Sequence, residues 1–153
     1  MSVIISPATE NDVAILYSFV CKLAVYENMV HHVESTVEDL REWLFGPRRV
    51  AEAAIAREGD TPVGAAIFFP LYSTYSGRPA IYIEDLFVDA EFRGKGVGRA
   101  LIEYLKGVAR DRRYDRLVWS VLKWNDQAIR FYEGLGATVV DEWWTYRLDV
   151  GAS

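Results

Sequence analysis

Two spacings of apolar residues occur along this chain, and each indicates a different kind of secondary structure. Apolar residues three or four positions apart predict helices near residues 9–28, 36–46, 100–109 and 126–135. Runs of β-branched and aromatic residues predict strands at residues 3–5, 50–57, 63–71, 81–88, 116–122, 137–140 and 143–148. The predicted order is β-α-α-β-β-β-α-β-α-β-β. Because strands and helices alternate, we expect a single α/β or α+β sheet.

A glycine-rich loop, Arg93-Gly-Lys-Gly-Val-Gly98, joins the predicted strand at 81–88 to the next helix. Glycines at the start of a helix let the backbone approach a ligand closely, and the free N–H groups of the first turn favour an anion. Lys95 and Arg99 add positive charge to that of Arg93. The loop therefore predicts a phosphate or pyrophosphate ligand; the alternative is a turn that only joins strand to helix.

Two common phosphate-binding motifs do not match this loop. A P-loop requires Ser or Thr directly after Gly-Lys, whereas Gly96 follows Lys95. The dinucleotide-binding pattern Gly-x-Gly-x-x-Gly also fails, because its last position falls on Arg99 or Leu101. The pattern that does fit is Arg93-x-x-Gly96-x-Gly98.

Composition is typical of an ordinary globular protein. Of the 153 residues, 51% are hydrophobic and 25% charged, which suits one domain, residues 1–153, with a full core. No apolar run approaches the length of a membrane span, and the N-terminus lacks a signal-peptide pattern. Cys21 is the only cysteine, so no disulfide framework is expected, and its apolar helix face predicts core packing. We expect a cytoplasmic protein that does not bind membranes.

Charge is distributed unevenly along the chain. The net charge of −5 argues against nucleic-acid binding. Between Glu91 and Arg116, eight Lys or Arg face four Asp or Glu, which would suit a polyphosphate around the glycine loop. The acidic remainder would attract a cationic second substrate. His31 and His32 have no acidic or cysteine cluster beside them, so no metal site is predicted.

Two adjacent acids, Glu84 and Asp85, interrupt an otherwise apolar strand. Neighbours in a strand point to opposite faces, so at least one carboxylate faces a packed layer or a cleft. Burial there would raise its pKa towards that of a useful general base. For Asp85, a satisfied structural pair and a functional carboxylate remain equally open, whereas for Glu84 we favour a functional role.

A second stretch with candidate chemistry is Asn125-Asp-Gln-Ala-Ile-Arg-Phe-Tyr132, closed by Gly134 and Gly136. Asn125 ends a strand and can cap the following helix. Tyr132 lies on the apolar face of that helix, where a core aromatic with a satisfied hydroxyl is the alternative to a functional residue.

Both stretches resemble motifs of the GCN5-related N-acetyltransferase (GNAT) family. The pyrophosphate-binding motif of the family resembles Arg93-x-x-Gly96-x-Gly98. A second family motif resembles Asn-x-x-Ala-x-x-Phe-Tyr-x-x-x-Gly, which begins at Asn125. The element order is similar over nearly the whole chain. The resemblance implies a mixed, mostly antiparallel central sheet of six to seven strands with about four helices, and acetyl-coenzyme A as cosubstrate. The residues implied to bind the coenzyme are Leu86, Phe87, Val88, Arg93, Gly94, Lys95, Gly96, Val97, Gly98, Arg99, Asn125, Ala128 and Tyr132.

Further residues look like the diamine (spermidine/spermine) N-acetyltransferase branch, notably Tyr26-Glu27 and the strand around Glu84. The match is partial, because Val30-His31-His32 stand where the polyamine enzymes carry further acids. The chain therefore looks more like the thialysine acetyltransferase relatives, which implies a short diamine or lysine-like acceptor and a homodimer. The implied substrate-binding residues are Tyr26, Glu27, Tyr75, Glu84 and Asp85.

The resemblance implies direct acetyl transfer in a ternary complex, without a metal or a covalent enzyme intermediate. An alkylamine, with a pKa near ~10.4, must lose a proton before it attacks, and Glu84, directly or through a water, is the candidate base. Backbone N–H groups at 86–88 would polarise the thioester carbonyl, and Tyr132 would protonate the departing thiolate. The alternatives are a non-catalytic coenzyme-binding module and another acceptor, such as a protein N-terminus or an antibiotic amine.

Overall fold

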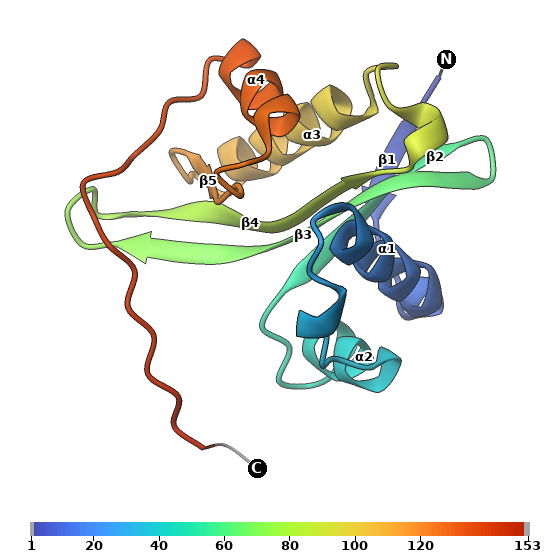
Figure 1. The fold of residues 1–153 in the computed structure, drawn as a ribbon, viewed down its shortest axis with the longest axis horizontal. Coiled ribbons are helices and arrows are strands. Elements are labelled where there is room, and N and C mark those ends of the chain that lie inside the picture. Colours follow the sequence, from blue (N-terminus) through green and yellow to red (C-terminus); the bar gives the residue numbers. More distant parts are fainter. Residues whose placement is uncertain (1, 152–153) are drawn as a thin grey trace. The chain divides into compact units, whose positions relative to one another are not determined.

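The structure, a computed structural model, describes residues 2–151 and follows the predicted order of elements as far as the fourth helix (Figure 1). The chain divides after Ser120 into two compact units. The first unit contains the sheet with helices α1 (Val13–Tyr26), α2 (Val37–Phe45) and α3 (Val97–Asp111). The second contains α4 (Asp126–Gly134) and the C-terminal segment.

The first unit is built on a five-stranded sheet whose strands follow chain order. They are β1 (Ile4–Pro7), β2 (Glu52–Glu58), β3 (Thr61–Ser73), β4 (Arg78–Val88) and β5 (Leu117–Trp119). Neighbouring strands are antiparallel except β4 and β5, which are parallel and are connected through α3. The predicted mixed, mostly antiparallel sheet is confirmed.

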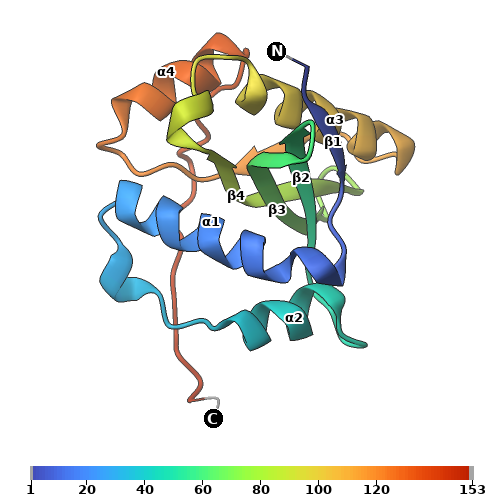
Figure 2. The same cartoon turned by 90° about the vertical axis from the view of Figure 1, so that its right-hand side faces the viewer.

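Helices cover both faces of this sheet. Figure 2 shows α1 and α2 on one face of the sheet and α3 on the other. Both α1 and α3 contact strands β3 and β4. A strand that is buried on both faces reads as a continuous apolar run rather than an alternating one. This explains the sequence of β2, in which four successive residues, 53–56, are all buried.

Side-chain hydrogen bonds fix the starts of the first two helices. At α2, the Asp39 N–H donates to Thr36 Oγ1 (3.2 Å) and the Thr36 N–H donates to Asp39 Oδ2 (2.9 Å), which is a capping box. Before α1, the Thr9 N–H donates to Asp12 Oδ2 (2.8 Å). Asp12 Oδ1 also accepts from Arg57 Nη2 (2.7 Å), so the same carboxylate ties the start of α1 to β2.

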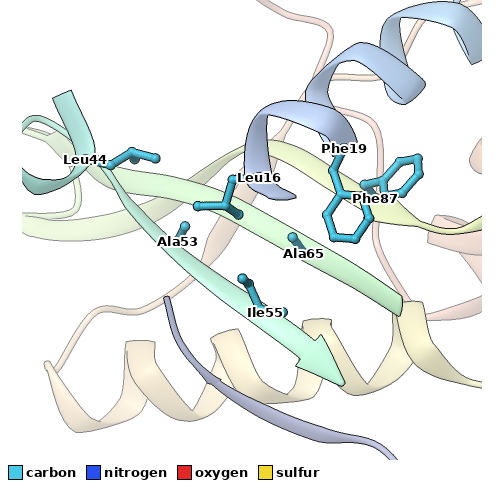
Figure 3. Packing of buried hydrophobic residues seen from close by; sticks show 7 residues of the cluster. All are labelled: Leu16, Phe19, Leu44, Ala53, Ile55, Ala65 and Phe87. Carbon is cyan, nitrogen blue, oxygen red and sulfur yellow. The ribbon is translucent and has the colours of Figure 1, made fainter. Parts of the chain in front are cut away.

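One hydrophobic cluster fills the space between α1, α2 and the sheet (Figure 3). Its buried members are Leu16, Phe19, Leu44, Ala53, Ile55, Ala65 and Phe87. The rings of Phe19 and Phe87 lie 4.8 Å apart, which joins α1 to the end of β4 that precedes the glycine loop. Burying side chains of this size stabilises the fold by about 1.5–3 kcal/mol each. Cys21, expected in the core, is only half-buried on α1.

Gly64 of β3 packs against β4 and α3. A Cβ at this position would be 2.6 Å from the Phe87 carbonyl oxygen and 3.2 Å from Val97 Cγ1. Backbone cannot yield as a side-chain tip can, so we expect Gly64→Ala to lower the free energy of unfolding by about 1–3 kcal/mol, measured in urea. Gly107→Ala is the control, because nothing lies within 4 Å of its Cβ position. Equal midpoints for Gly64→Ala and the unmutated protein would contradict this packing.

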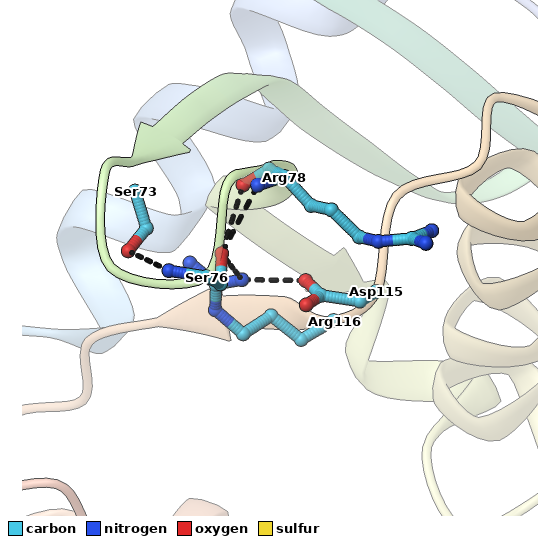
Figure 4. Close-up of polar contacts among 5 residues, drawn as sticks. All are labelled: Ser73, Ser76, Arg78, Asp115 and Arg116. Carbon is cyan, nitrogen blue, oxygen red and sulfur yellow. Dashed lines mark hydrogen bonds and ion pairs between the residues drawn. The ribbon is translucent and has the colours of Figure 1, made fainter.

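The turn between β3 and β4 is held by side-chain hydrogen bonds (Figure 4). The Ser76 N–H donates to Ser73 Oγ (3.3 Å), and the Arg78 N–H donates to Ser76 Oγ (3.2 Å). Arg116 Nη1 donates to the same hydroxyl (3.2 Å) from the residue just before β5. The residues between β3 and β4 therefore form a fixed hairpin turn whose position is tied to the parallel strand β5.

The two closing strands predicted at residues 137–140 and 143–148 are not formed. Within residues 2–151 the sheet has five strands instead of six to seven, and residues 137–151 form no helix or strand. Apolar side chains of this segment are exposed, Trp144 at 86% and Leu148 at 89%. A strand requires a neighbour that supplies hydrogen bonds, and an alternating pattern carries no information about that neighbour.

Candidate active site

A β-bulge in β4 determines which side of the sheet each of the adjacent acids faces. Phe68 of β3 lies opposite Ile83 and Ile67 lies opposite Asp85, so Glu84 has no partner in β3. One extra residue in a strand shifts the alternation of side chains by one position. Asp85 therefore takes the α1 side of the sheet, which Glu84 would face in a regular strand, and Glu84 is exposed.

The side chain of Asp85 lies in a pocket between α1 and strands β3 and β4. The other lining residues are all apolar: Leu16, Phe19, Val20, Leu23, Ala65, Ile67 and Phe87. The pocket volume is about 210 Å³, which includes open solvent at its mouth. Within the described residues 2–151, no hydrogen bond or ion pair is found for the Asp85 carboxyl. The spacing of apolar residues in the sequence cannot show that these side chains surround an acid.

These surroundings raise the pKa of Asp85 to about 7. Burial among apolar side chains is the largest cause, and repulsion from the carboxylates of Glu84 and Glu27 adds to it. A carboxyl with such a pKa exchanges its proton near neutral pH, the range in which a general acid or base works best. Of the two alternatives for Asp85, a satisfied structural pair therefore finds no support in the described residues.

Glu27 follows the last residue of α1 and brings a third carboxylate to this region. Burial raises the pKa of Glu27. The carboxylates of Glu27 and Glu84 both repel the charged form of Asp85. Three predicted substrate-binding residues, Glu27, Glu84 and Asp85, thus interact electrostatically although they come from two elements that are more than fifty positions apart in the sequence.

Tyr75, also predicted to bind substrate, lies elsewhere in this unit. It occupies the turn beyond the last pair of the β3–β4 hairpin, Ser73 and Arg78, and its side chain is 89% exposed. Asp85 pairs much farther along the same hairpin, opposite Ile67. The structure therefore does not bring Tyr75 to the three carboxylates.

The glycine loop uses a backbone conformation that glycine adopts easily. Gly94 and Gly96 have φ angles of 75° and 87°, a left-handed region that side chains disfavour. Gly96 caps α3, which begins at Val97, and its carbonyl accepts the first helical hydrogen bond, from the Ala100 N–H (3.0 Å). The N–H groups at 97–99 have no partner within the helix, and the loop around Lys95 is exposed. This is a suitable anion site.

Arg93 connects the glycine loop to the end of α1. Its Nε donates to the Val88 carbonyl oxygen (3.1 Å), and its guanidinium carbon lies 4.6 Å from the centre of the Tyr26 ring. Lys95 lies over the Phe92 ring at 5.4 Å. Two of the three cationic side chains predicted to meet a pyrophosphate, Arg93 and Lys95, thus lie against aromatic rings beside the loop, and Arg93 also contacts a predicted substrate residue.

One edge of β4 is open where it approaches the glycine loop. β5 pairs only with Ile81, Tyr82 and Ile83, whereas β4 continues to Val88. Within residues 2–120 no strand pairs with this edge beyond Ile83. Alternate peptide groups of the stretch 84–88, which contains the predicted coenzyme contacts at 86–88, are therefore available to a ligand that can accept and donate hydrogen bonds.

The second unit holds the other predicted coenzyme residues. Asn125 is buried at 5% exposure, and its Oδ1 accepts from the Ala128 N–H (3.2 Å), which confirms it as the cap of α4. Tyr132 is half-buried on α4, with its ring centre 5.4 Å from that of Phe131. The cap and the aromatic pair fix the orientation of Tyr132 on its own helix.

Two further features bear on the chemistry. Among residues 2–151, no group of three or more His, Cys, Asp or Glu is placed to hold a metal ion. No helix in the same part of the chain is both long and apolar enough to cross a membrane.

Several known proteins are similar to this chain in sequence and in fold. The family model described as Acetyltransferase (GNAT) family matches residues 18–137. The thialysine N-epsilon-acetyltransferase of Caenorhabditis elegans is 35% identical, covering 90% of this chain and 86% of the relative. The thialysine N-epsilon-acetyltransferase of Sus scrofa is 32% identical, and the match covers 97% of this chain and 93% of the relative. The integron cassette protein VCH_CASS6 of V. cholerae aligns with a TM-score of 0.80 and 26% identity, covering 99% of this chain and 94% of that chain.

The family match extends over most of the chain, including both glycine-loop and α4 motifs, and two relatives exceed 30% identity over nearly its full length. The chain therefore belongs to the acetyltransferase (GNAT) family, in its diamine and thialysine branch, and is an N-acetyltransferase.

Proposed function

We propose that residues 1–153 act as one domain that transfers acetyl from acetyl-coenzyme A to a primary amine of a small cationic acceptor. The observation that carries this proposal is the gathering of three carboxylates, Glu27, Glu84 and Asp85, next to an open strand edge and a glycine-capped helix. A cation and a polyphosphate would thus be bound close to one another, as acetyl transfer between them requires.

Acetyl-coenzyme A fits the residues around the glycine loop. The N–H groups at the start of α3, with Arg93, Lys95 and Arg99, would hold the pyrophosphate. The open edge of β4 at 86–88 would bind the pantetheine amides, and an N–H of this stretch would polarise the thioester carbonyl. On the second unit, Asn125, Ala128 and Tyr132 would contact the pantetheine arm. Members of the GNAT family use this cosubstrate.

A lysine-like amine is the acceptor that the residues favour. Two relatives are thialysine N-epsilon-acetyltransferases by name. Val30, His31 and His32 form a 3-10 turn after Glu27, and this turn contributes no carboxylate for the distant amines of a long polyamine. Three carboxylates that interact electrostatically suit one ammonium group with a short chain, and Tyr26 would flank that chain.

The proposed chemistry is direct transfer in a ternary complex. Glu27 and Glu84 attract and hold the ammonium group, and the pair Glu84–Asp85 supplies the base that removes its proton. The amine nitrogen then attacks the thioester carbon, and Tyr132 protonates the departing thiolate. Holding both substrates in one site contributes much of the rate, because the reaction becomes effectively unimolecular. The branch resemblance also supports a homodimer.

Thiol release from acetyl-coenzyme A tests this function directly. Purified protein would be supplied with putrescine, spermidine, spermine, lysine, thialysine or no acceptor. We expect turnover with lysine and thialysine at least tenfold faster, by kcat/KM, than with spermine. Faster turnover of spermine would contradict the acceptor assignment. Tight coenzyme binding without turnover of any amine would favour the non-catalytic module, and the absence of coenzyme binding would overturn the proposal.

A further inference from the structure

We propose that Asp85, rather than its exposed neighbour Glu84, accepts the proton of the acceptor ammonium group, an assignment that rests on the proposed amine acetylation. Glu84 then serves as an anchor for the cation. The division of roles comes from the bulge of β4, which points Asp85 towards α1 and leaves Glu84 without a partner strand residue.

Geometry separates the two carboxyls. Asp85 is enclosed by apolar side chains of α1, β3 and β4, whereas Glu84 is exposed to water. A carboxylate in water loses little by staying charged, so it binds a cation without taking its proton. A carboxylate in an apolar pocket is stabilised by becoming neutral, and an ammonium group that enters the same pocket is stabilised in the same way. Proton transfer from ammonium to Asp85 removes both charges at once.

The charged groups around Asp85 act in the same direction. The pocket surfaces of α1 and β3 contribute only apolar residues, so the facing carboxylates are Glu84 on β4 and Glu27 at the end of α1. Lys22, the nearby cation of α1, is paired with Asp89 (3.3 Å). The pKa of an alkylamine, ~10.4, exceeds the Asp85 pKa of about 7 by roughly three units. For an ordinary aspartate the difference is about twice as large, so proton transfer from the ammonium group to Asp85 is less unfavourable.

The space beside Asp85 is narrow and opens to solvent. It has room for about one water-sized group, such as an ammonium head, so the chain and the rest of the acceptor would stay outside.

The proton balance of the reaction is complete with this assignment. The ammonium group gives one proton to the Asp85 carboxylate, which becomes a carboxylic acid, and the neutral amine forms the C–N bond as the C–S bond breaks. The nitrogen then loses a second proton, which balances the proton that the thiolate gains. Asp85 returns its proton to water, so one proton is released for each acetyl group transferred.

The pH dependence of turnover tests the proposal. The initial rate of thiol release would be measured from pH 5.5 to 9.5 with the fastest acceptor of the amine panel, for the unmutated protein, Asp85→Asn and Glu84→Gln. For the unmutated protein, kcat/KM should rise with a midpoint near pH 7 and then level off. Asp85→Asn should lower kcat/KM about 100-fold at pH 7 and remove that midpoint, leaving a rise of about tenfold per pH unit from the free amine alone.

Glu84→Gln should instead raise KM for the amine and retain a midpoint, shifted below pH 7 because the repulsion between Glu84 and Asp85 is lost. Asp60→Asn, an exposed acid in the β2–β3 turn, is the matched control and should retain the unmutated rate at every pH. A midpoint that persists in Asp85→Asn, or that disappears in Glu84→Gln, would overturn the assignment. If the unmutated protein itself releases no thiol with any amine, the proposed function fails instead, which is a separate result.

Discussion

Tyr132→Phe is expected to lower kcat for acetyl transfer about 1,000-fold while leaving the Kd for coenzyme A unchanged. The departing thiolate must gain a proton, and the phenol hydroxyl is the group proposed to supply it. Phenylalanine keeps the ring, its contact with Phe131 and the apolar face of α4, while the phenol hydroxyl is removed. Steady-state thiol release gives kcat, and isothermal titration calorimetry gives the coenzyme affinity.

Tyr146→Phe provides the matched control for this substitution. It removes the same hydroxyl from a side chain that is 85% exposed, in the segment after α4. We expect its kcat to stay within a factor of two of the unmutated protein. A Tyr132→Phe enzyme that also stays within a factor of three would show that the thiolate takes its proton from another donor, such as water.

Asp85→Asn is expected to stabilise the protein at pH 8 by at most about 4 kcal/mol, although the same substitution slows turnover. The folded state raises the pKa of Asp85 from 3.8 to about 7. Below pH 4 the carboxyl is neutral in both folded and unfolded chains, so it matches the neutral amide that replaces it. Between pH 4 and 7 the unfolded chain releases the proton while the folded one keeps it, so the unmutated protein loses about 1.4 kcal/mol per pH unit.

Urea unfolding at pH 5, 6, 7 and 8 measures this effect. The difference in free energy of unfolding between Asp85→Asn and the unmutated protein should grow with pH up to pH 7 and then level off. Asp60→Asn should show no such growth, because its side chain is exposed in a turn. A constant difference across the pH range would mean that the pocket does not keep Asp85 protonated.

Together, the stability and activity of Asp85→Asn distinguish a functional acid from a structural one. A satisfied structural carboxylate contributes to stability, so its removal destabilises the fold. An acid held in an apolar pocket without a compensating partner costs stability, and such a residue is retained where activity requires it. We therefore expect Asp85→Asn to make the folded protein more stable and, at the same time, to slow acetyl transfer.

The positions of the glycine loop and of the α4 cap were predictable from the sequence. The glycine loop joins β4 to α3 as predicted, and its Gly94 and Gly96 adopt left-handed φ angles that side chains disfavour. Asn125 caps α4, because an amide at that position satisfies a free N–H of the first turn. These features depend on residues within one turn or one loop of each other, and the two motifs they form sufficed to identify the family.

The arrangement of the acids was decided only by the tertiary structure. The sequence showed that Glu84 and Asp85 lie on opposite sides of a strand, but the choice between them depends on the bulge opposite Ile67 and Phe68. A bulge arises from the pairing of two strands, so counting along one strand cannot locate it. The approach of Glu27 to Asp85 likewise depends on how α1 packs on the sheet.

The same reason applies to the C-terminal segment. Its alternating apolar residues predicted strands, yet residues 137–151 form none, because a strand exists only with a partner that the pattern does not specify. The sequence thus determined the elements whose hydrogen bonds are local, together with the chemistry of each motif. The tertiary structure determined which distant residues meet, and with it which carboxyl of this acetyltransferase lies in an apolar pocket that raises its pKa to about 7.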